Sequence, residues 1–478
     1  MNFGYKKLYI GGELADARSG ARRDVICPGT EEACGEIAWG GLEDAEAALD
    51  AAARAFRSYS RSSLKERAHW MSVLREAVIG RENELRTAVM YEMGKPWEAT
   101  AEDHQAVVEA LDWYAEEMQH ARDTILPDTG GAFRHQVIAQ PVGVVAAFLA
   151  WNFPLLNIGF KLGPALAAGC SIILRPSSSS PLSAYVLGEI CREVNFPAGV
   201  INILCGPAET TASPIARSRV PRLVTMIGSS ETGRRLIAES ATSIKRASME
   251  LGGNAPVLVF EDADLAIAAR ETAALKFGNC GQICVAPNRI YIHETVYQDF
   301  RDLFLAEAHQ VRVGFGQEQR PTMGPLIDAR ARARVQELVR DAVASGARIA
   351  AGGHVPESMT RGYFYEPTVL EDVTPAMRVF REEIFGPVAP LLRFTSEEEA
   401  VESANKTEYG LVAYVYTRDV ARVRRVSEAL EFGEVMVNGF KYGIDLPHGG
   451  IKESGVGKDC SHYALEDYLI RKRITLKC

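Results

Sequence analysis

From residue 142 onward, short apolar runs alternate with segments of helical length, and this alternation limits the chain to a small set of folds. The runs VGVVAAFLA, SIILRP, VINILCG and RLVTMIG are separated by IGFKLGPALAAG, SAYVLGEICREV and AETTASPIARS. An apolar run followed by a helix and a further run is typical of βαβ units, whose strands form a parallel sheet covered by helices. The sequence therefore predicts an α/β fold.

A second set of the same signals predicts a second α/β domain. It runs from APVLVF at 255 through RIYIHE to VAYVYT and EVMVNG. Residues 42–119 carry apolar side chains at spacings of three and four, the pattern of packing helices. Because 478 residues exceed one ordinary core, two or three domains are expected.

Composition excludes two classes of protein. Hydrophobic residues make up 47% and charged residues 24% of the chain, which is globular usage, so most of it should fold. The net charge of -9 lacks the basic excess that a phosphate backbone requires, so no nucleic-acid partner is expected.

The cysteines and the N-terminal segment bear on the cellular location. Nine scattered cysteines do not form a disulfide framework, and no apolar run that could act as a secretion signal follows the early lysines. A cytoplasmic location is expected.

One uncharged stretch has the length of a membrane span. It runs from Pro141 to Phe160 and contains Asn152, Asn157 and Pro154. A proline would break a helix at its middle, and Val142–Ala150 has the length and valine content of a strand buried on both faces. We therefore expect no membrane partner.

Two strand-like segments fit neither predicted sheet. They are RHQVIAQP at 134–141 and IRKRITLKC at the C-terminus, both with alternating polar positions. Such strands need an edge to pair with, so they are candidates for an intersubunit sheet, and ordinary exposed edge strands are the alternative.

Cys284 in FGNCGQICVAPNR (277–289) is the first candidate for chemistry. Gly281 permits close backbone approach, and the N–H of the cysteine can face a developing oxyanion. Cys280 lies four residues earlier, but no histidines at matching spacing complete a zinc site, so no metal is expected. A buried structural cysteine is the alternative.

Glu250 and Asn152 are the next candidates. Glu250 in SMELGGNAP stands at a predicted strand end between two apolar residues, where partial burial would raise its pKa toward that of a general base. Asn152 in AWNFP follows an apolar strand, at the sheet edge where ligands usually bind. A surface glutamate and a structural loop asparagine are the alternatives.

A glycine- and serine-rich turn at Gly228–Gly233 follows the run RLVTMI and opens a predicted helix. Backbone N–H groups at such a helix start can bind a pyrophosphate, although the segment is not a GxGxxG motif. An ordinary turn with an N-cap serine is the alternative. The segment Arg175-Pro176-Ser177-Ser178 ends a neighbouring strand of the same predicted sheet.

Taken in this order and with these gaps, the segments resemble the NAD(P)-dependent aldehyde dehydrogenase superfamily over essentially the whole chain. The motifs that carry the resemblance are AWNFP, LRPS, MIGSSETG, MELGG, FGNCGQIC, EEIFGP and PHGGIKESGVG. Each is weak alone, and their co-occurrence is specific.

The resemblance implies a fold and three catalytic roles. It implies a Rossmann-type cofactor domain (1–121 and 142–252), a catalytic domain (253–445), and an oligomerisation arm with a C-terminal strand (122–141 and 465–478), hence homodimers or homotetramers. Cys284 would be the nucleophile and Glu250 the base that activates the hydrolytic water. Asn152 and the Cys284 N–H would form the oxyanion hole.

The resemblance also implies a cofactor site and a choice of cofactor. The residues implied to bind NAD or NADP are Trp151, Arg175, Ser178, Gly228, Ser229, Gly233, Leu251, Glu383 and Phe385. Many members have a glutamate at position 178, which binds the adenosine ribose and repels a 2′-phosphate. Serine does not repel it, and Arg175 can pair with it, so NADP use is expected beside NAD.

The substrate is where the sequence departs from the branch it most resembles. MELGGNAPVLVFEDADL and ALEDYL look closest to succinate semialdehyde dehydrogenases, in which two arginines hold the substrate carboxylate. Phe160 and Gly278 stand at those positions here. We therefore expect an uncharged or aromatic aldehyde, in a pocket lined by Asn157, Phe160, Gly278, Ile283, Val285, Tyr442 and His448.

Three other functions stay open at this stage. A succinate or other semialdehyde would need Lys441 or another residue as its cation. A non-catalytic relative and a thiol esterase are further alternatives, and the esterase would need neither Gly228–Gly233 nor Glu383. His448 replaces the phenylalanine usual in its motif.

Overall fold

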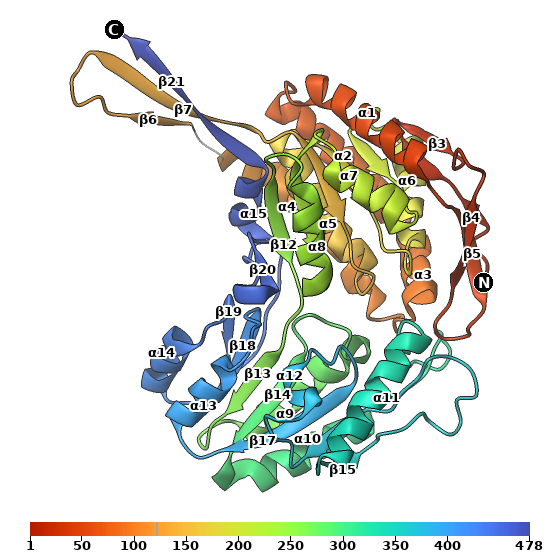
Figure 1. The fold of residues 1–478 in the computed structure, drawn as a ribbon, viewed down its shortest axis with the longest axis vertical. Helices are drawn as coiled ribbons and strands as arrows, with labels where there is room; N and C mark the ends of the chain where they lie inside the picture. Colours follow the sequence, from red (N-terminus) through yellow and green to blue (C-terminus); the bar gives the residue numbers. More distant parts are fainter. Residues whose placement is uncertain (121–122) are drawn as a thin grey trace.

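The apolar runs after residue 142 form the centre of an eight-stranded sheet in the computed structural model, which describes residues 1–120 and 123–478 (Figure 1). From edge to edge its strands are β20 (Gly455–Val456), β12 (Arg246–Glu250), β11 (Pro221–Ile227), β8 (Val144–Phe148), β9 (Ser171–Arg175), β10 (Ile201–Ile203), β2 (Leu8–Ile10) and β3 (Glu13–Ala15). The strands from β12 to β10 pair in parallel, and the outer ones pair antiparallel.

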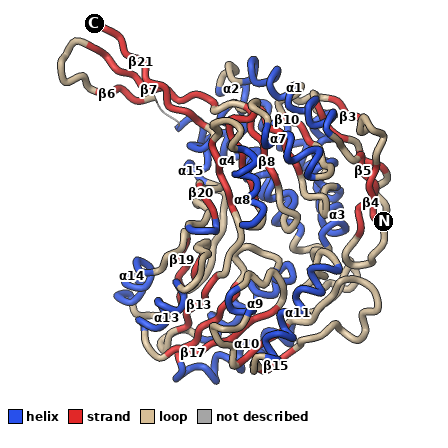
Figure 2. Tube along the Cα trace, viewed as in Figure 1, coloured by secondary structure: helices blue, strands red, loops and turns tan. Residues whose placement is uncertain are grey.

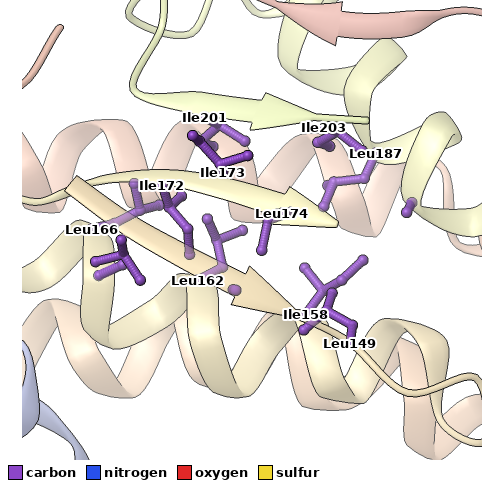
Figure 3. Close-up of a cluster of buried hydrophobic side chains, with 14 of the residues drawn as sticks. Leu149, Ile158, Leu162, Leu166, Ile172, Ile173, Leu174, Leu187, Ile201 and Ile203 are labelled. Carbon is purple, nitrogen blue, oxygen red and sulfur yellow. The ribbon is translucent and has the colours of Figure 1, made fainter. Parts of the chain in front are cut away.

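Helices cover both faces of this sheet because its central strands carry apolar side chains on both sides. All five residues of β8 are buried. Figure 3 shows leucines and isoleucines of β9, β10, α5 and α6 meeting in this core. The helices of this half are α1 (Leu42–Tyr59), α2 (Leu64–Gly80), α3 (Glu82–Met93), α4 (Thr100–Glu117), α5 (Pro154–Ala168), α6 (Leu182–Glu193), α7 (Ser213–Arg217), α8 (Ser230–Ser240) and α15 (Ser461–Asp467).

A seven-stranded sheet forms the second half of the molecule. Its order is β15 (Arg348–Ala351), β16 (Thr368–Glu371), β17 (Val388–Phe394), β14 (Pro287–His293), β13 (Ala255–Val259), β18 (Val412–Tyr416) and β19 (Glu434–Val437), parallel except for β15. Its helices are α9 (Leu265–Phe277), α10 (Tyr297–Gln310), α11 (Ala329–Ala344), α12 (Arg378–Arg381), α13 (Glu397–Asn405) and α14 (Val420–Ala429).

Buried apolar residues fall into two clusters, one for each sheet. The first spans Leu8 to Leu251 and resumes from Ile444 to Leu469, and the second spans Ala255 to Phe432. The chain thus returns to the first sheet after leaving the second, and β20 pairs with β12. The segment 446–464, which the sequence-based boundaries leave unassigned, contacts both halves. Cys460 and Ala464 belong to the first core, and the backbone of Gly449 and Ile451 bonds to Glu434 and Gly410 of the second half. The functions assigned to the domains stay a prediction.

The two strand-like segments outside the sheets pair with each other. β7 (Phe133–Pro141) and β21 (Leu469–Lys477) run antiparallel, β6 (Thr124–Leu126) joins β7, and the ribbon projects from the body (Figures 1 and 2). The predicted boundary between 121 and 122 falls on residues outside the described ones. A separate three-stranded sheet on the other side contains β1 (Tyr5–Lys6), β5 (Ala33–Ala38) and β4 (Arg22–Ile26).

The uncharged stretch around Pro154 is a strand followed by the start of a helix. Pro154 occupies the first turn of α5, where the missing N–H has no helical partner to lose, and Gly169 ends the helix in a left-handed conformation. Across residues 1–120 and 123–478, no helix has the length and apolar character to cross a membrane.

Candidate active site

The loop that carries Cys284 follows α9 through a sharp turn, η3 (Gly278–Gly281). Asn279, Cys280 and Gly281 have φ values of 47°, 58° and 69°, the left-handed region. A Cβ on Gly281 would lie 2.1 Å from the carbonyl oxygen of Gly386, so only glycine fits there. This turn sends the chain across the end of the second sheet and places Cys284 in a cavity.

Gln282 fixes this loop from inside the protein. Its side chain is fully buried, donates to the carbonyl oxygens of Asn279 (3.0 Å) and Pro325 (3.3 Å), and accepts from the Ile327 N–H (2.8 Å). A buried amide with its donors and acceptor used holds the backbone in one arrangement. The position of Cys284 is therefore set before any ligand binds.

Asn152 bridges the first half of the molecule to the same loop. Nδ2 of Asn152 donates to the Gln282 carbonyl oxygen (3.1 Å). The backbone carbonyl oxygen of Asn152 in turn accepts from Nδ2 of Asn279 (3.0 Å). Among the described residues the buried Oδ1 of Asn152 has no hydrogen-bond partner. Because an amide nitrogen carries two hydrogens, Asn152 keeps one donor for a developing oxyanion.

Glu250 ends β12 and points into the same cavity. It is 4% exposed, and neither carboxylate oxygen has a hydrogen-bond partner within the described part of the chain. Burial raises its pKa to about 7, although the positive charge of His448 acts to lower that pKa. A carboxylate of this kind is available as a general base near neutral pH.

His448 joins the candidate groups from the C-terminal segment. Its Nε2 lies 3.7 Å from Oε2 of Glu250, and its Nδ1 forms an ion pair of 2.8 Å with Oε1 of Glu434 on β19. Phe160 and Tyr442 lie beside the ring, with centroid distances of 6.3 and 5.9 Å. Sequence reasoning missed Glu434, and its signal was a carboxylate at the start of the apolar run EVMV.

The Cys284 thiol is half-buried, and two effects oppose each other at it. Burial raises its pKa and the neighbouring His448 imidazole lowers it, and the net pKa is above its ordinary value. Cys280, four residues earlier, is fully buried, and burial raises the pKa of its thiol as well. Each thiol has a cationic neighbour, His448 for Cys284 and Lys276 for Cys280, and of the two cysteines it is Cys284 that lines the cavity.

A buried ion pair lies beneath Glu250. Lys161 on α5 is fully buried and pairs with Asp459, and Asp459 forms backbone hydrogen bonds in both directions with His448. The lysine charge lowers the pKa of Glu250 and the aspartate charge raises it. This pair ties the segment that carries His448 to the helix that follows Asn152, and sequence analysis gave no sign of it.

The opposite end of the cavity has the donors that a dinucleotide pyrophosphate needs. Gly228 and Ser229 line it at the start of α8, and the Ser229 side chain accepts from the Thr232 N–H. The first N–H groups of a helix have no helical partner, so those of α8 suit an anion. Gly233 does not line the cavity, because it packs against Leu251, where a Cβ would lie 2.7 Å from a leucine methyl.

Glu383, Phe385, Trp151 and Leu251 line the same end. Glu383 accepts from the Gly253 N–H (2.8 Å), and burial raises the pKa of its carboxyl to about 7. The rings of Trp151 and Phe385 meet edge to face at 5.4 Å. These side chains surround a space with one carboxylate and two aromatic rings, which fits a ribose and a nicotinamide ring.

Arg175 and Ser178 lie outside the cavity lining, at the end of β9. The Arg175 guanidinium donates to the Gly206 carbonyl oxygen (2.8 Å) and to Oγ1 of Thr211 (3.5 Å). Their roles toward an adenosine ribose, like that of Gly233 toward a pyrophosphate, stay predictions.

The cavity has a volume of about 840 Å³ and takes its walls from both sheets. All seven predicted pocket residues line it, namely Asn157, Phe160, Gly278, Ile283, Val285, Tyr442 and His448. Further lining residues that sequence reasoning left out include Glu434, Phe440 and Leu446. In the described ranges no group of three or more His, Cys, Asp or Glu is arranged to hold a metal ion.

Comparisons with known proteins agree on one family. The model described as "Aldehyde dehydrogenase family" matches residues 15–474. The chain is 41% identical to the 3-sulfolactaldehyde dehydrogenase of Pseudomonas putida, over 98% of this chain and 97% of that protein. It is 40% identical to the NADP(+) succinate-semialdehyde dehydrogenase of Escherichia coli, over 97% and 96%. The succinate-semialdehyde dehydrogenase structure from Burkholderia pseudomallei superposes with a TM-score of 0.97 at 39% identity, covering 99% of this chain and 98% of that one.

Proposed function

Because the chain belongs to the aldehyde dehydrogenase family and is an NAD(P)-dependent enzyme of that family, we propose that it oxidises an uncharged or aromatic aldehyde to the carboxylic acid. The observation that carries the proposal is the shared cavity of Cys284, Glu250 and Asn152. The Cys284 thiolate attacks the aldehyde carbon, and Asn152 with the Cys284 N–H stabilises the oxyanion. Glu250 then takes a proton from the water that hydrolyses the thioester.

NADP or NAD would bind along α8 and Glu383. When bound, it accepts the hydride that leaves the thiohemiacetal carbon. Gly228 and Ser229 would lie at the pyrophosphate, Glu383 at the nicotinamide ribose, and Phe385 and Trp151 at the ring. We propose use of both cofactors, because Ser178 adds no negative charge where NADP carries its 2′-phosphate.

The character of the pocket walls supports an uncharged substrate. Phe160, Ile283, Val285 and Tyr442 are apolar or aromatic, and the Glu250 and Glu434 carboxylates line the same cavity. Three other lining cations are paired, Lys95 with Asp103, Arg234 with Glu453 and Arg334 with Glu382. Arg381 and Lys441 also line the cavity and form no ion pair among the described residues. An anionic aldehyde would lose hydration there and gain repulsion.

A semialdehyde is the second candidate, and two observations favour it. Lys441 lines the cavity, and two relatives are named for succinate semialdehyde. In this case Lys441 would pair with the substrate carboxylate.

Initial rates of reduced-nicotinamide formation separate the two candidates. We expect a higher kcat/KM for benzaldehyde-type substrates than for succinate semialdehyde, because the pocket offers aromatic contacts. Lys441→Met is the matched variant, and under our proposal it leaves the ratio of the two kcat/KM values unchanged. A strong preference for succinate semialdehyde that Lys441→Met abolishes would instead establish the second candidate.

We further propose that the projecting ribbon joins copies of the chain into a dimer or tetramer. Ile125 on β6 and Leu476 on β21 are 72% and 58% exposed. A three-stranded ribbon that leaves the body with exposed apolar side chains needs a partner surface.

Replacing both side chains by aspartate should dissociate the oligomer. The double variant Ile125→Asp, Leu476→Asp buries two charges in the proposed interface, and light scattering should report a molar mass of one chain. Ile244→Asp is the control, since Ile244 is 94% exposed and belongs to none of the three ribbon strands, and it should keep the wild-type mass. An unchanged mass in the double variant would exclude the ribbon as the interface.

A further inference from the structure

His448 lies where the candidate nucleophile, the candidate base and a third buried acid meet. Nε2 is 3.7 Å from Oε2 of Glu250, and Nδ1 is 2.8 Å from Oε1 of Glu434. The imidazole and the Cys284 thiol line the same cavity, and the imidazole lowers the pKa of the thiol. The side chains of His448, Glu250 and Glu434 are 13%, 4% and 12% exposed. Water therefore screens this cluster weakly, and each charge acts strongly on the others.

A backbone hydrogen bond fixes the Glu434 carboxylate beside His448. The same Oε1 that pairs with Nδ1 of His448 accepts the N–H of Gly449, the next residue along the chain (3.0 Å). The carboxylate is thus fixed by the backbone that carries the ring. Nδ1 is close to Glu434 as an ion pair, although it forms no hydrogen bond among the described residues, and Nε2 lies on the side of Glu250.

Other charged and polar groups near the cluster pair with one another. Lys161 on α5 pairs with Asp459, whose backbone bonds to His448. Tyr442 lies beside the ring, and its hydroxyl is 2.7 Å from that of Tyr414 on β18. The cation that faces both Glu250 and Cys284 is therefore His448.

We propose that His448, anchored by Glu434, is a positioning residue whose charge favours the ionised, reactive forms of Cys284 and Glu250 against the effect of their burial. The imidazolium carries one proton on Nε2, on the side of Glu250, and one on Nδ1, on the side of Glu434, and its charge stabilises the thiolate when Cys284 loses its proton to solvent. After attack on the aldehyde, sulfur is uncharged and the imidazolium faces the two carboxylates of Glu250 and Glu434. The Glu250 carboxylate then stays ionised until it takes the proton of the hydrolytic water.

The shifts in pKa agree with this geometry. Burial by itself lowers the pKa of His448, but the charge of Glu250 and the contacts with Cys284 and Glu434 raise it well above its ordinary value. In return the imidazolium lowers the pKa of Cys284 and of Glu250, both of which burial raises. Removal of the ring would leave both acids protonated to a higher pH.

The inference rests on the proposed function, and its test uses neither aldehyde nor nicotinamide. The rate of Cys284 alkylation by iodoacetamide is measured against pH by mass spectrometry of the peptide that contains Cys284, in a Cys478→Ser background that removes the exposed thiol. The variants are His448→Phe, His448→Gln and Glu434→Gln. Glu408→Gln removes a carboxylate that lines the same cavity and is the matched control.

We expect both His448 variants to raise the pH midpoint of alkylation by about one unit, so that the rate below the midpoint falls about tenfold. Glu434→Gln should shift the midpoint in the same direction, and Glu408→Gln should leave it in place. His448→Gln keeps a polar side chain without the charge, so a wild-type midpoint in that variant would overturn the proposal. If the variants shift the alkylation midpoint but the wild-type enzyme oxidises no tested aldehyde, the role of His448 toward Cys284 and Glu250 would stand and the substrate assignment would be rejected.

Discussion

Replacing Cys284 by alanine is expected to lower aldehyde oxidation by more than about a thousandfold, because no covalent intermediate can then form. The loop around Cys284 is fixed by Gln282 and Asn152, so the smaller side chain should leave the site intact. The measurement is the rate of reduced-nicotinamide formation at saturating aldehyde, with cofactor binding measured separately by thermal shift. Retained binding with lost turnover would assign the defect to chemistry.

Cys280→Ala is the matched control for this variant. Cys280 is in the same loop, is fully buried and does not line the cavity. Alanine there removes one buried sulfur, and activity should persist with a modest loss of stability. If Cys280→Ala were the inactive variant and Cys284→Ala the active one, the nucleophile assignment would be wrong.

Replacing Glu250 by glutamine should block the second half of the reaction and spare the first. The isosteric amide cannot accept the proton of the hydrolytic water, so steady-state turnover should fall by about 10² to 10⁴. Cys284 is still present, so one equivalent of reduced nicotinamide per site should form in an initial burst. Rapid mixing followed by steady-state rates separates the two phases, and wild-type turnover in this variant would remove Glu250 from the mechanism.

The pH dependence gives a second readout of Glu250. Its pKa is about 7, raised by burial, and only the ionised form can accept a proton. Wild-type turnover should therefore rise with pH through about 7 and level off above it, and the glutamine variant should lose this rise. Glu408→Gln, which leaves Glu250 in place, should keep the rise.

Much of the protein follows from local patterns in the sequence. The alternation after residue 142 predicts a parallel sheet because a strand buried on both faces needs apolar residues at every position, and β8, β9 and β11 form its centre. The motifs around Cys284 and Glu250 are short and each lies at the end of one helix or strand, so they can be found in the sequence. Their order along the chain indicates the family, which the comparisons confirm. The two strands outside the sheets are confirmed as strands, and they pair with each other.

Only the tertiary structure decided which side chains from distant segments meet. Lys161 and Asp459 are 298 positions apart, and Glu434 stands next to His448 because a strand of one sheet begins beside a loop packed on the other. The packing of Gly233 against Leu251 was likewise decided by the tertiary structure, and its predicted role toward a pyrophosphate stays a prediction. Periodicity and turn chemistry are local properties that a sequence displays directly. The charge environment of Cys284 depends on how the two halves pack, and no spacing along the chain encodes that.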